Sequence, residues 1–316
     1  MDHFTDIVAV MVPLAVEAPY SYRVPQGMSV ARGSIVVVPL IGRSYVGVVW
    51  GPPEDMVAHN RLKDIEHVYD APPLSEELLE TIDWVARYTL AAPGMVLRAV
   101  LRSTEALEPE RPVAAYRRTG YEPERMTPAR SRVLETVADG LAWAKAAIVG
   151  ASGVSPSVIE GLEKAGALER LEVAPSPIVL PPDIDGAPAT LSPGQAEALA
   201  SIRELDPVRF GVALLDGVTG AGKTEVFFEA VADTLRAGRQ ALVLLPEIAL
   251  TSTFLARFAR RFGTKPAEWH SDMTPAQRTR TWRGVMNGTV RAVVGARSAL
   301  FLPFNELGLI VLDEEH

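Results

Sequence analysis

The sequence predicts a multidomain protein in which a small β-rich domain and a winged-helix domain precede an α/β lobe with a phosphate-binding loop and a parallel sheet. Three observations carry this prediction. Short apolar stretches separated by Gly and Pro fill the first hundred residues. A Pro-rich stretch follows at 174–188, typical of an extended linker. Beyond Thr190, apolar strands alternate with amphipathic helices, which is typical of a parallel α/β sheet.

The composition is that of a globular protein. The chain has 316 residues, of which 48% are hydrophobic and 22% charged. It has no apolar run near the roughly 18–20 residues of a membrane-spanning helix. Without cysteine there are no disulfides and no cysteine-ligated zinc in these residues. The first ten residues lack the basic start of a secretory signal, so we expect a cytoplasmic protein without membrane contact.

The β-rich domain is expected over residues 1–105. Its strands are predicted at Ile7–Val12, Ser34–Pro39 and Tyr45–Trp50, where apolar residues alternate or run together. A helix should begin after Ser75, a suitable N-cap, and the Pro-Gly pair at 93–94 should end that stretch.

Residues 106–174 are expected to form the winged helix. The expected helices cover Pro128–Ala138, Trp143–Val149 and Ser155–Ala165, and Gly166–Val173 reads as a strand or wing. The third helix of such a domain often enters DNA, but here it holds Glu160, Glu163 and Lys164. A packing or protein-contact role therefore stays open beside DNA binding. Residues 175–189 are expected to be the linker.

The lobe is expected over residues 190–316. Its strands are nearly all apolar, which suits a sheet covered on both faces. They are predicted at Gly211–Asp216, Ala241–Leu245, Ala292–Gly295 and Leu309–Leu312. The helices are predicted at Thr224–Ala237, Ala249–Phe262 and Pro275–Met286.

Residues Gly217–Thr224 match the phosphate-loop pattern in full. Glycines such as Gly220 and Gly222 let successive N–H groups turn toward phosphate oxygens, and the next helix adds its dipole. Lys223 is expected to bridge the β- and γ-phosphates and Thr224 to ligate Mg²⁺. The pattern indicates a nucleoside triphosphate site.

An acidic strand end completes this site. Four apolar residues run into Asp313-Glu314-Glu315-His316. Such carboxylates emerge at the carboxyl edge of a parallel sheet, the usual ligand side. Asp313 is expected to hold Mg²⁺, and Glu314 to orient or deprotonate the attacking water. Upstream, the planar amide of Gln195 suits adenine, which would make the nucleotide ATP.

Basic residues gather between 252 and 300. This segment contains nine Lys and Arg residues and only two acidic residues, Glu268 and Asp272, although the whole chain carries a net charge of −8. The cations are Arg257, Arg260, Arg261, Lys265, Arg278, Arg280, Arg283, Arg291 and Arg297. Solvated helix faces and phosphate contacts are both open interpretations of this segment.

Together these motifs resemble the first, RecA-like motor lobe of a superfamily 2 DExH-box helicase. The resemblance rests on Gln195, GVTGAGKTEV, LLPEIALT at 244–251, GARSALFLPF at 295–304 and DEEH at 313–316. Together with HSDMT and LIVLDEEH, these motifs are similar in sequence to those of the PriA family of primosomal replication-restart helicases.

The resemblance implies an ATP-driven 3′→5′ DNA helicase that recognises stalled or abandoned forks. It implies that His316 couples the nucleotide site to the DNA, and that Leu245–Thr251 and Gly295–Leu300, with Arg297, line the DNA track. Forked DNA with a free 3′ end, single-stranded DNA, primosome and helicase-loading proteins and single-stranded DNA-binding protein are the implied partners.

The resemblance also implies a pocket for a DNA 3′ end. Its matching positions are Tyr20, Ser21, Gly42 and Lys63. Tyr20 can stack on a terminal base, but Ser21 replaces an acidic residue and, being neutral, should bind the 3′-hydroxyl less strongly.

The lobe is incomplete in these residues. The second lobe with its arginine finger and the family's cysteine-rich zinc module do not occur in the 316 residues. We therefore expect DNA and weak ATP binding without unwinding, since a missing finger costs ~10³–10⁵ in rate. Another DExH translocase and a non-catalytic DNA-binding or scaffold fragment are the alternatives.

Overall fold

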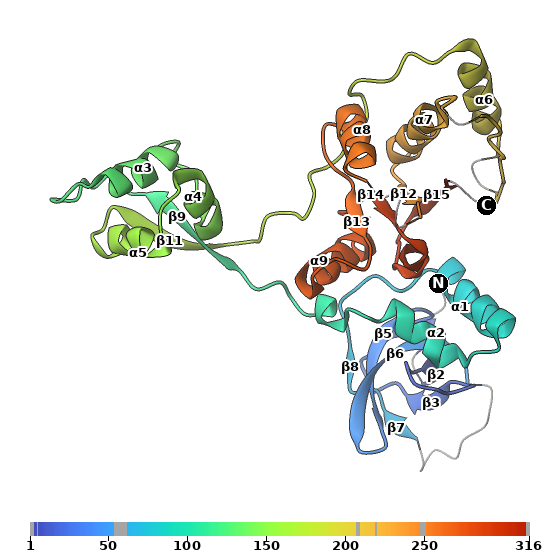
Figure 1. Ribbon diagram of the computed structural model, residues 1–316. Helices are drawn as coiled ribbons and strands as arrows, with labels where there is room; N and C mark the ends of the chain where they lie inside the picture. Colours follow the sequence, from blue (N-terminus) through green and yellow to red (C-terminus); the bar gives the residue numbers. More distant parts are fainter. Residues whose placement is uncertain are drawn as a thin grey trace. The chain divides into compact units, whose positions relative to one another are not determined.

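The computed structural model describes residues 3–4, 6–53, 62–206, 209–218, 220–246 and 251–313. It divides into two compact units. Unit 1 combines residues 1–108 with 178–316, and unit 2 comprises residues 109–177 (Figure 1).

A six-stranded sheet forms the N-terminal part of unit 1, in the order β7-β3-β2-β6-β5-β8. The alternating valines of β2 and β5 bury one face in a core with Tyr22 and Ile65. The strands are β2 Ile7–Met11, β3 Tyr20–Arg23, β5 Ile35–Leu40, β6 Arg43–Gly51, β7 Lys63–Asp64 and β8 His67–Val68; β1 His3–Phe4 pairs separately with β4 Val30–Ala31. The three predicted strands are confirmed within one residue at most ends.

Two helices and a 3₁₀ turn follow this sheet. Helix α1 (Glu76–Thr89) begins as expected, because the Ser75 hydroxyl accepts a hydrogen bond from the Leu78 amide. The Pro-Gly pair, expected to end this stretch, instead begins α2 (Pro93–Val100), since proline at the first helical position needs no hydrogen bond. The turn η2 (Thr104–Leu107) leads to unit 2.

Unit 2 packs three helices on a three-stranded antiparallel sheet of order β10-β9-β11. The helices are α3 Pro128–Thr136, α4 Lys145–Ser152 and α5 Pro156–Lys164; the strands are β9 Val113–Arg118, β10 Trp143–Ala144 and β11 Leu168–Val173. The start of the predicted second helix is wrong, since Trp143 and Ala144 pair with Tyr116 and Ala115 before α4 begins.

The lobe is a parallel sheet of order β13-β14-β12-β15, covered on both faces. Alternate residues of β12 face α7 and α8 on one side and α9 on the other. The strands are β12 Gln240–Leu244, β13 Ala267–Trp269, β14 Ala292–Gly295 and β15 Leu307–Leu312. The helices are α6 Pro193–Arg203, α7 Lys223–Arg236, α8 Ser252–Phe262, α9 Pro275–Met286 and the 3₁₀ turn η4 Arg297–Phe301.

The predicted strand at Gly211–Asp216 is wrong. Residues 209–218 pair with none of the described strands. Val212 and Leu214 are 76% and 92% exposed, so their apolar character is not used by the core of unit 1. The apolar run has the right composition for a strand, but a strand also needs a partner edge.

The stretch predicted as a linker is partly packed on the lobe. Ile178 and Val179 join the core beside α9. The Asp183 amide donates to the Phe262 carbonyl at 2.8 Å, and Arg261 Nη1 donates to the Ile184 carbonyl at 3.1 Å. The Pro-rich composition indicated extension correctly but not this attachment.

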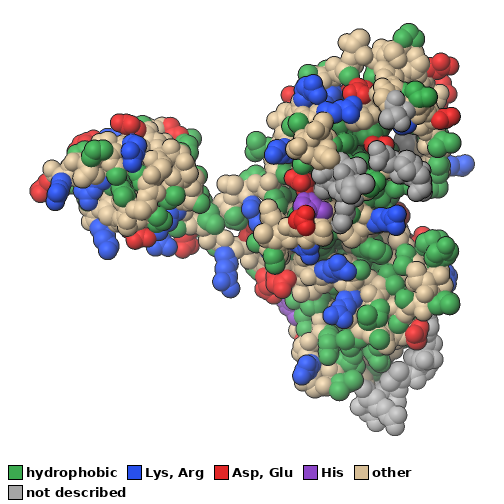
Figure 2. All heavy atoms as spheres, in the orientation of Figure 1, with side chains coloured by type: hydrophobic (Ala, Val, Ile, Leu, Met, Phe, Trp, Pro, Cys, Tyr) green, Lys and Arg blue, Asp and Glu red, His purple; other side chains and the backbone are tan. Residues whose placement is uncertain are grey.

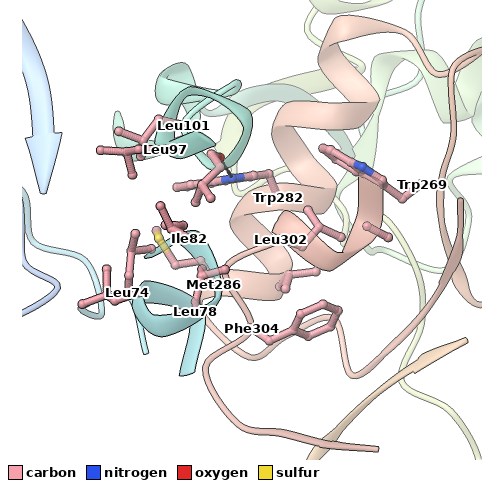
Figure 3. Close-up of a cluster of buried hydrophobic side chains, with 14 of the residues drawn as sticks. Leu74, Leu78, Ile82, Leu97, Leu101, Trp269, Trp282, Met286, Leu302 and Phe304 are labelled. Atoms are coloured by element: carbon pink, nitrogen blue, oxygen red, sulfur yellow. Dashed lines mark hydrogen bonds between the residues drawn. The ribbon is translucent and has the colours of Figure 1, made fainter. Parts of the chain in front are cut away.

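One hydrophobic core joins the N-terminal sheet and its helices to the lobe. Figure 3 shows Leu78, Ile82 and Leu97 lying against Trp282 and Met286 of α9. Trp282 Nε1 donates to the Val100 carbonyl at the end of α2, at 2.8 Å. Unit 1 is therefore a single packed body although it is discontinuous in sequence.

Candidate nucleotide and DNA site

The phosphate loop connects residues 209–218 to α7. The Ala221 amide donates to the Val218 carbonyl at 3.1 Å, and Gly220 and Gly222 have φ angles of 82° and 79°. Thr219 lies outside the described residues. These left-handed conformations, which glycine adopts without penalty, curl the chain into the first turn of α7.

Lys223 and Thr224 form the start of α7. Lys223 Nζ donates to the Gly217 carbonyl at 2.6 Å, so the ammonium folds back over the loop. Thr224 is half-buried in the first helical turn. A cation over a cradle of backbone N–H groups at a helix N-terminus suits a polyphosphate.

Gln195 is bound to the phosphate loop. Its Oε1 accepts from the Ser192 amide at 2.8 Å as part of a capping box. Its Nε2 donates to the carbonyls of Ala221 and Gly222, at 2.9 and 3.4 Å. A Cβ on Gly222 would lie 2.3 Å from this Nε2. Both ends of the amide are thus engaged within the chain, and adenine reading stays a prediction.

Asp313 follows β15 at the carboxyl edge of the sheet. Its amide donates to the Leu244 carbonyl at 3.1 Å, which fixes it beside the end of β12. Helix α7, which the phosphate loop enters, packs against β12 and against β15, which Asp313 follows. Glu314 and His316 lie outside the described residues, as do residues 247–250 of the expected DNA track.

The donor set fits ATP with Mg²⁺. The Thr224 hydroxyl and Asp313 carboxylate are oxygen ligands, which Mg²⁺ prefers. A Cβ at Gly222 would clash with Gln195 and approach Glu225 Oε2, so the curled loop requires glycine at this position. Among the described residues, no group of three or more His, Cys, Asp or Glu side chains gathers as a metal cage. Magnesium at such loops takes few protein ligands and the phosphates themselves.

Many cations of the basic segment are used inside the chain. Those with internal partners include Arg257, Arg261, Arg278, Arg283 and Arg291. Arg260, Lys265 and Arg297 are exposed, the last at the start of η4. On the face in Figure 2, Lys and Arg are scattered among acidic and hydrophobic side chains. A large part of the sequence signal therefore reflects packing.

Three of the four expected 3′-end residues lie on the neighbouring strands β3 and β7 of the N-terminal sheet. Tyr20 and Ser21 lie on β3. Lys63 lies on β7, where it is the strand partner of Tyr22. Strand alternation places Tyr20 on one face of β3 and Ser21 on the other. Tyr20 is 40% exposed, and Gly42 is exposed at the turn between β5 and β6.

Tyr22, which the sequence reasoning missed, supports this region. Its hydroxyl donates to the Pro39 carbonyl at 3.2 Å and so ties β3 to the strand that leads to Gly42. Burial, followed by the nearby Tyr20 and Glu66, raises the pKa of Tyr22 to about 12. The phenol therefore stays a neutral donor. The alternation in β3 was the available signal, since it places residue 22 on the same face as Tyr20.

Two acidic residues of α7 were also missed. Glu225 pairs with Arg257 and Glu229 with Arg261, each at 2.6 Å, and both pairs join α7 to α8. Their four-residue spacing on each helix was visible in the sequence. The partner helix was not, because the two helices are separated by β12.

Comparison with known proteins defines the class. The model of the PriA 3′ DNA-binding domain (3′BD) matches residues 9–102, and that of the DEAD/DEAH box helicase matches residues 192–316. The chain is thus a helicase-type α/β domain preceded by a β-rich 3′ DNA-binding domain.

Relatives identify the family. The chain is 31% identical over 314 residues to the replication restart protein PriA of Rickettsia conorii, covering 98% of this chain and 37% of that protein. It is 31% identical over 323 residues to the PriA of Haemophilus influenzae, covering 97% and 44%. With the PriA of Bacillus subtilis it shares 45% over 130 residues, 41% of this chain and 16% of that one. The chain belongs to the PriA family. It spans about two fifths of the length of the Rickettsia conorii and Haemophilus influenzae proteins.

No described helix is long and apolar enough to pass through a lipid bilayer.

Proposed function

We propose that the chain is the DNA-recognising and ATP-binding part of a 3′→5′ DNA helicase that acts at stalled or abandoned replication forks and initiates primosome assembly. The observation that carries this proposal is the packing of a 3′ DNA-binding domain and a phosphate-loop lobe into one body. A DNA end held by the first part thereby gains a defined relation to the nucleotide site of the second. This combination favours the proposal over a generic DExH translocase.

Each residue of the nucleotide site has a proposed role. Lys223 binds the β- and γ-phosphates, and Thr224 and Asp313 hold the Mg²⁺ that neutralises charge on the transferred phosphoryl group. Glu314 orients the water, and His316 links the site to DNA. Gln195 holds the loop by donating to the carbonyls of Ala221 and Gly222. When ATP binds, its amide releases these carbonyls and forms hydrogen bonds with adenine instead.

DNA contacts are proposed on both parts of unit 1. Tyr20 stacks on the terminal base while Ser21, Gly42 and Lys63 hold the sugar and phosphate of a 3′ end. Arg297, exposed beside the end of β14, contacts the phosphate backbone of single-stranded DNA. These contacts need no base readout, which suits a protein that acts on forks of any sequence.

Unit 2 is proposed to be a winged helix. Three helices on a three-stranded sheet support this. On α5, Glu160 is paired with Lys145, so this helix presents little net positive charge to phosphate. That arrangement favours a protein contact for α5, which agrees with primosome, helicase-loading and single-stranded DNA-binding proteins as partners.

The domain limits proposed are 1–105, 106–174 and 190–316 with a connecting segment at 175–189. Unwinding is proposed for the full-length protein. For these 316 residues we propose ATP and DNA binding without unwinding, because hydrolysis in such motors takes place between two lobes.

A double dissociation of binding tests the proposal. We expect Lys223→Ala to abolish binding of a fluorescent ATP analogue and to leave binding of a duplex with a 3′ single-stranded end unchanged. We expect Tyr20→Ala to weaken that DNA roughly tenfold through lost stacking and to leave the nucleotide unaffected. The unaltered chain should prefer a 3′-hydroxyl to a 3′-phosphate in fluorescence anisotropy. Equal affinity for the two ends would refute 3′-end recognition.

A further inference from the structure

We propose that Glu225 is a positioning residue that couples the phosphate loop to α8, with Arg257 as its partner. The inference rests on the proposed function, since it connects the nucleotide site to the helix that follows the expected DNA track. It is carried by contacts that join α7 to α8 at two levels.

The carboxylate of Glu225 lies between the phosphate loop and α8. The Glu225 amide donates to the Gly222 carbonyl at 3.1 Å, which fixes the residue to the last turn of the loop. Its Oε1 accepts from Arg257 Nη2 at 2.6 Å. Its Oε2 lies 3.2 Å from the position that a Cβ on Gly222 would take. One carboxylate oxygen thus contacts α8, and the other lies against the loop.

A second ion pair holds the two helices together one turn further on. Arg261 donates to both carboxylate oxygens of Glu229, at 2.6 and 3.1 Å. The side chains of Arg261 and Glu229 are only 6% and 13% exposed. Phe227 and Phe228 pack against Phe254 and Phe258 between the same helices. Helices α7 and α8 therefore form one block.

The two ion pairs differ in how freely their side chains can move. The Glu225–Arg257 pair is the outer pair, and the Glu229–Arg261 pair is the inner pair. The side chains of Arg257 and Glu225 are 33% and 31% exposed, about half-way between surface and core. The inner pair is desolvated and bidentate, so breaking it is costly. The outer pair can respond to a change of charge next to it while the inner pair keeps the helices in register.

A bound triphosphate would bring that change of charge. Its phosphates at the N-terminus of α7 repel the Glu225 carboxylate, and Arg257 offsets this repulsion. A shift of Arg257 acts on the N-terminal part of α8, which is capped by Thr251 at the end of the expected DNA track, while Arg261 holds its C-terminal turn in place. Nucleotide occupancy and DNA affinity are thereby linked, and the linkage is reciprocal.

A double-mutant cycle on DNA affinity tests this coupling. The Kd for single-stranded DNA is measured on the intact 316-residue chain with and without a non-hydrolysable ATP analogue and Mg²⁺. The variants are Glu225→Gln, Arg257→Gln and the double variant. Asp233→Asn is the matched control, because Asp233 also forms ion pairs from α7 but toward Arg203 and Arg236.

We expect the analogue to change the DNA Kd of the unaltered chain and of Asp233→Asn by about fivefold or more, and that of each single variant by less than about twofold. The double variant should lose no more coupling than a single one, because both substitutions remove the same interaction. Arg257→Gln should also weaken analogue binding, since it leaves Glu225 unpaired beside the phosphates, whereas Glu225→Gln should not.

Two results with the variants overturn the inference. Full coupling in Glu225→Gln would show that the carboxylate is a structural surface group. Equal effects of Arg257→Gln and Glu225→Gln on analogue binding would show that the Glu225 carboxylate does not repel the bound phosphates. If the unaltered chain binds no nucleotide or no DNA, both the inference and the proposed function fail. If it binds both but the analogue leaves the DNA Kd unchanged, only the inference fails.

Discussion

Gly94 shows how a single position fixes the packing of the N-terminal helices. A Cβ at this residue would lie 2.1 Å from the Leu14 carbonyl oxygen and 2.5 Å from that of Val12. Helix α2 therefore lies directly on the backbone that follows β2, at a distance that only glycine permits. Its φ angle is ordinary, so the requirement is for space and not for an unusual backbone conformation.

The expected cost of filling this space can be measured against a matched glycine. Gly94→Ala should destabilise unit 1 by roughly 1–3 kcal/mol or more, because backbone oxygens cannot yield. Gly150 in α4 has no atom near the position of a Cβ, and Gly150→Ala should stabilise unit 2 by about 0.5–1 kcal/mol. Urea unfolding of both variants tests this, and equal effects would contradict the close contact.

Helix α8 depends on a buried charge at its C-terminal turn. Arg261 is 6% exposed, is paired with Glu229, donates to the Ile184 carbonyl and lies 4.8 Å from the centre of the Phe262 ring. It therefore joins α7, α8 and the segment before α6. Its neighbour Arg260 is exposed.

This contrast gives a test on adjacent arginines. Arg261→Ala should cost about 3–5 kcal/mol, since it leaves the Glu229 carboxylate buried without its partner. Arg260→Ala should change stability by less than about 0.5 kcal/mol. Chemical denaturation of the two variants distinguishes structural from exposed cations, and a small effect at Arg261 would show that solvent reaches Glu229.

Elements with complete local signals could be predicted from the sequence. Helix α9 begins and ends at the predicted residues, because Thr274 and Gln277 form a capping box around Pro275. The curled loop before Lys223 likewise follows from its glycines. In both cases the determining contacts lie within a few residues along the chain.

Features that depend on distant partners could not be predicted. The apolar run at 211–216 resembles a strand, but strand formation requires a neighbour that local sequence does not specify. Proline and glycine at 93–94 permit either a turn or a helix start, and packing of α2 on Leu14 decides between them. Likewise, the charge of Arg257 and Arg261 was evident, but their use in packing was not.

At the scale of the whole molecule, unit 1 has a core shared by two parts of the sequence. Trp282, 1% exposed, contributes to it from the lobe, while Leu78, Leu97 and Val100 contribute from the N-terminal helices. Arg283 reinforces the contact by donating to the carbonyls of Ala106, Glu105 and Glu108. Residues 109–177 are thus inserted into a body that is closed without them.

We expect calorimetry to resolve separate transitions for unit 1 and unit 2. Trp282→Ala should lower the transition of unit 1 by roughly 10 °C, because it removes a buried aromatic side chain and the partner of the Val100 carbonyl. Trp84→Ala serves as the control, since Trp84 is 55% exposed on α1. An early, separate melting of the N-terminal sheet in the unaltered chain would contradict a shared core.

The position of β15 at one end of the lobe sheet has a practical consequence. Only one of its edges is paired among the described strands, and Ile310 and Leu312 are 44% and 58% exposed beside it. An open edge with apolar side chains is a template for intermolecular strand addition. Concentrated solutions of these 316 residues should therefore self-associate reversibly, so binding constants are best measured at low concentration, with the sedimentation coefficient recorded alongside.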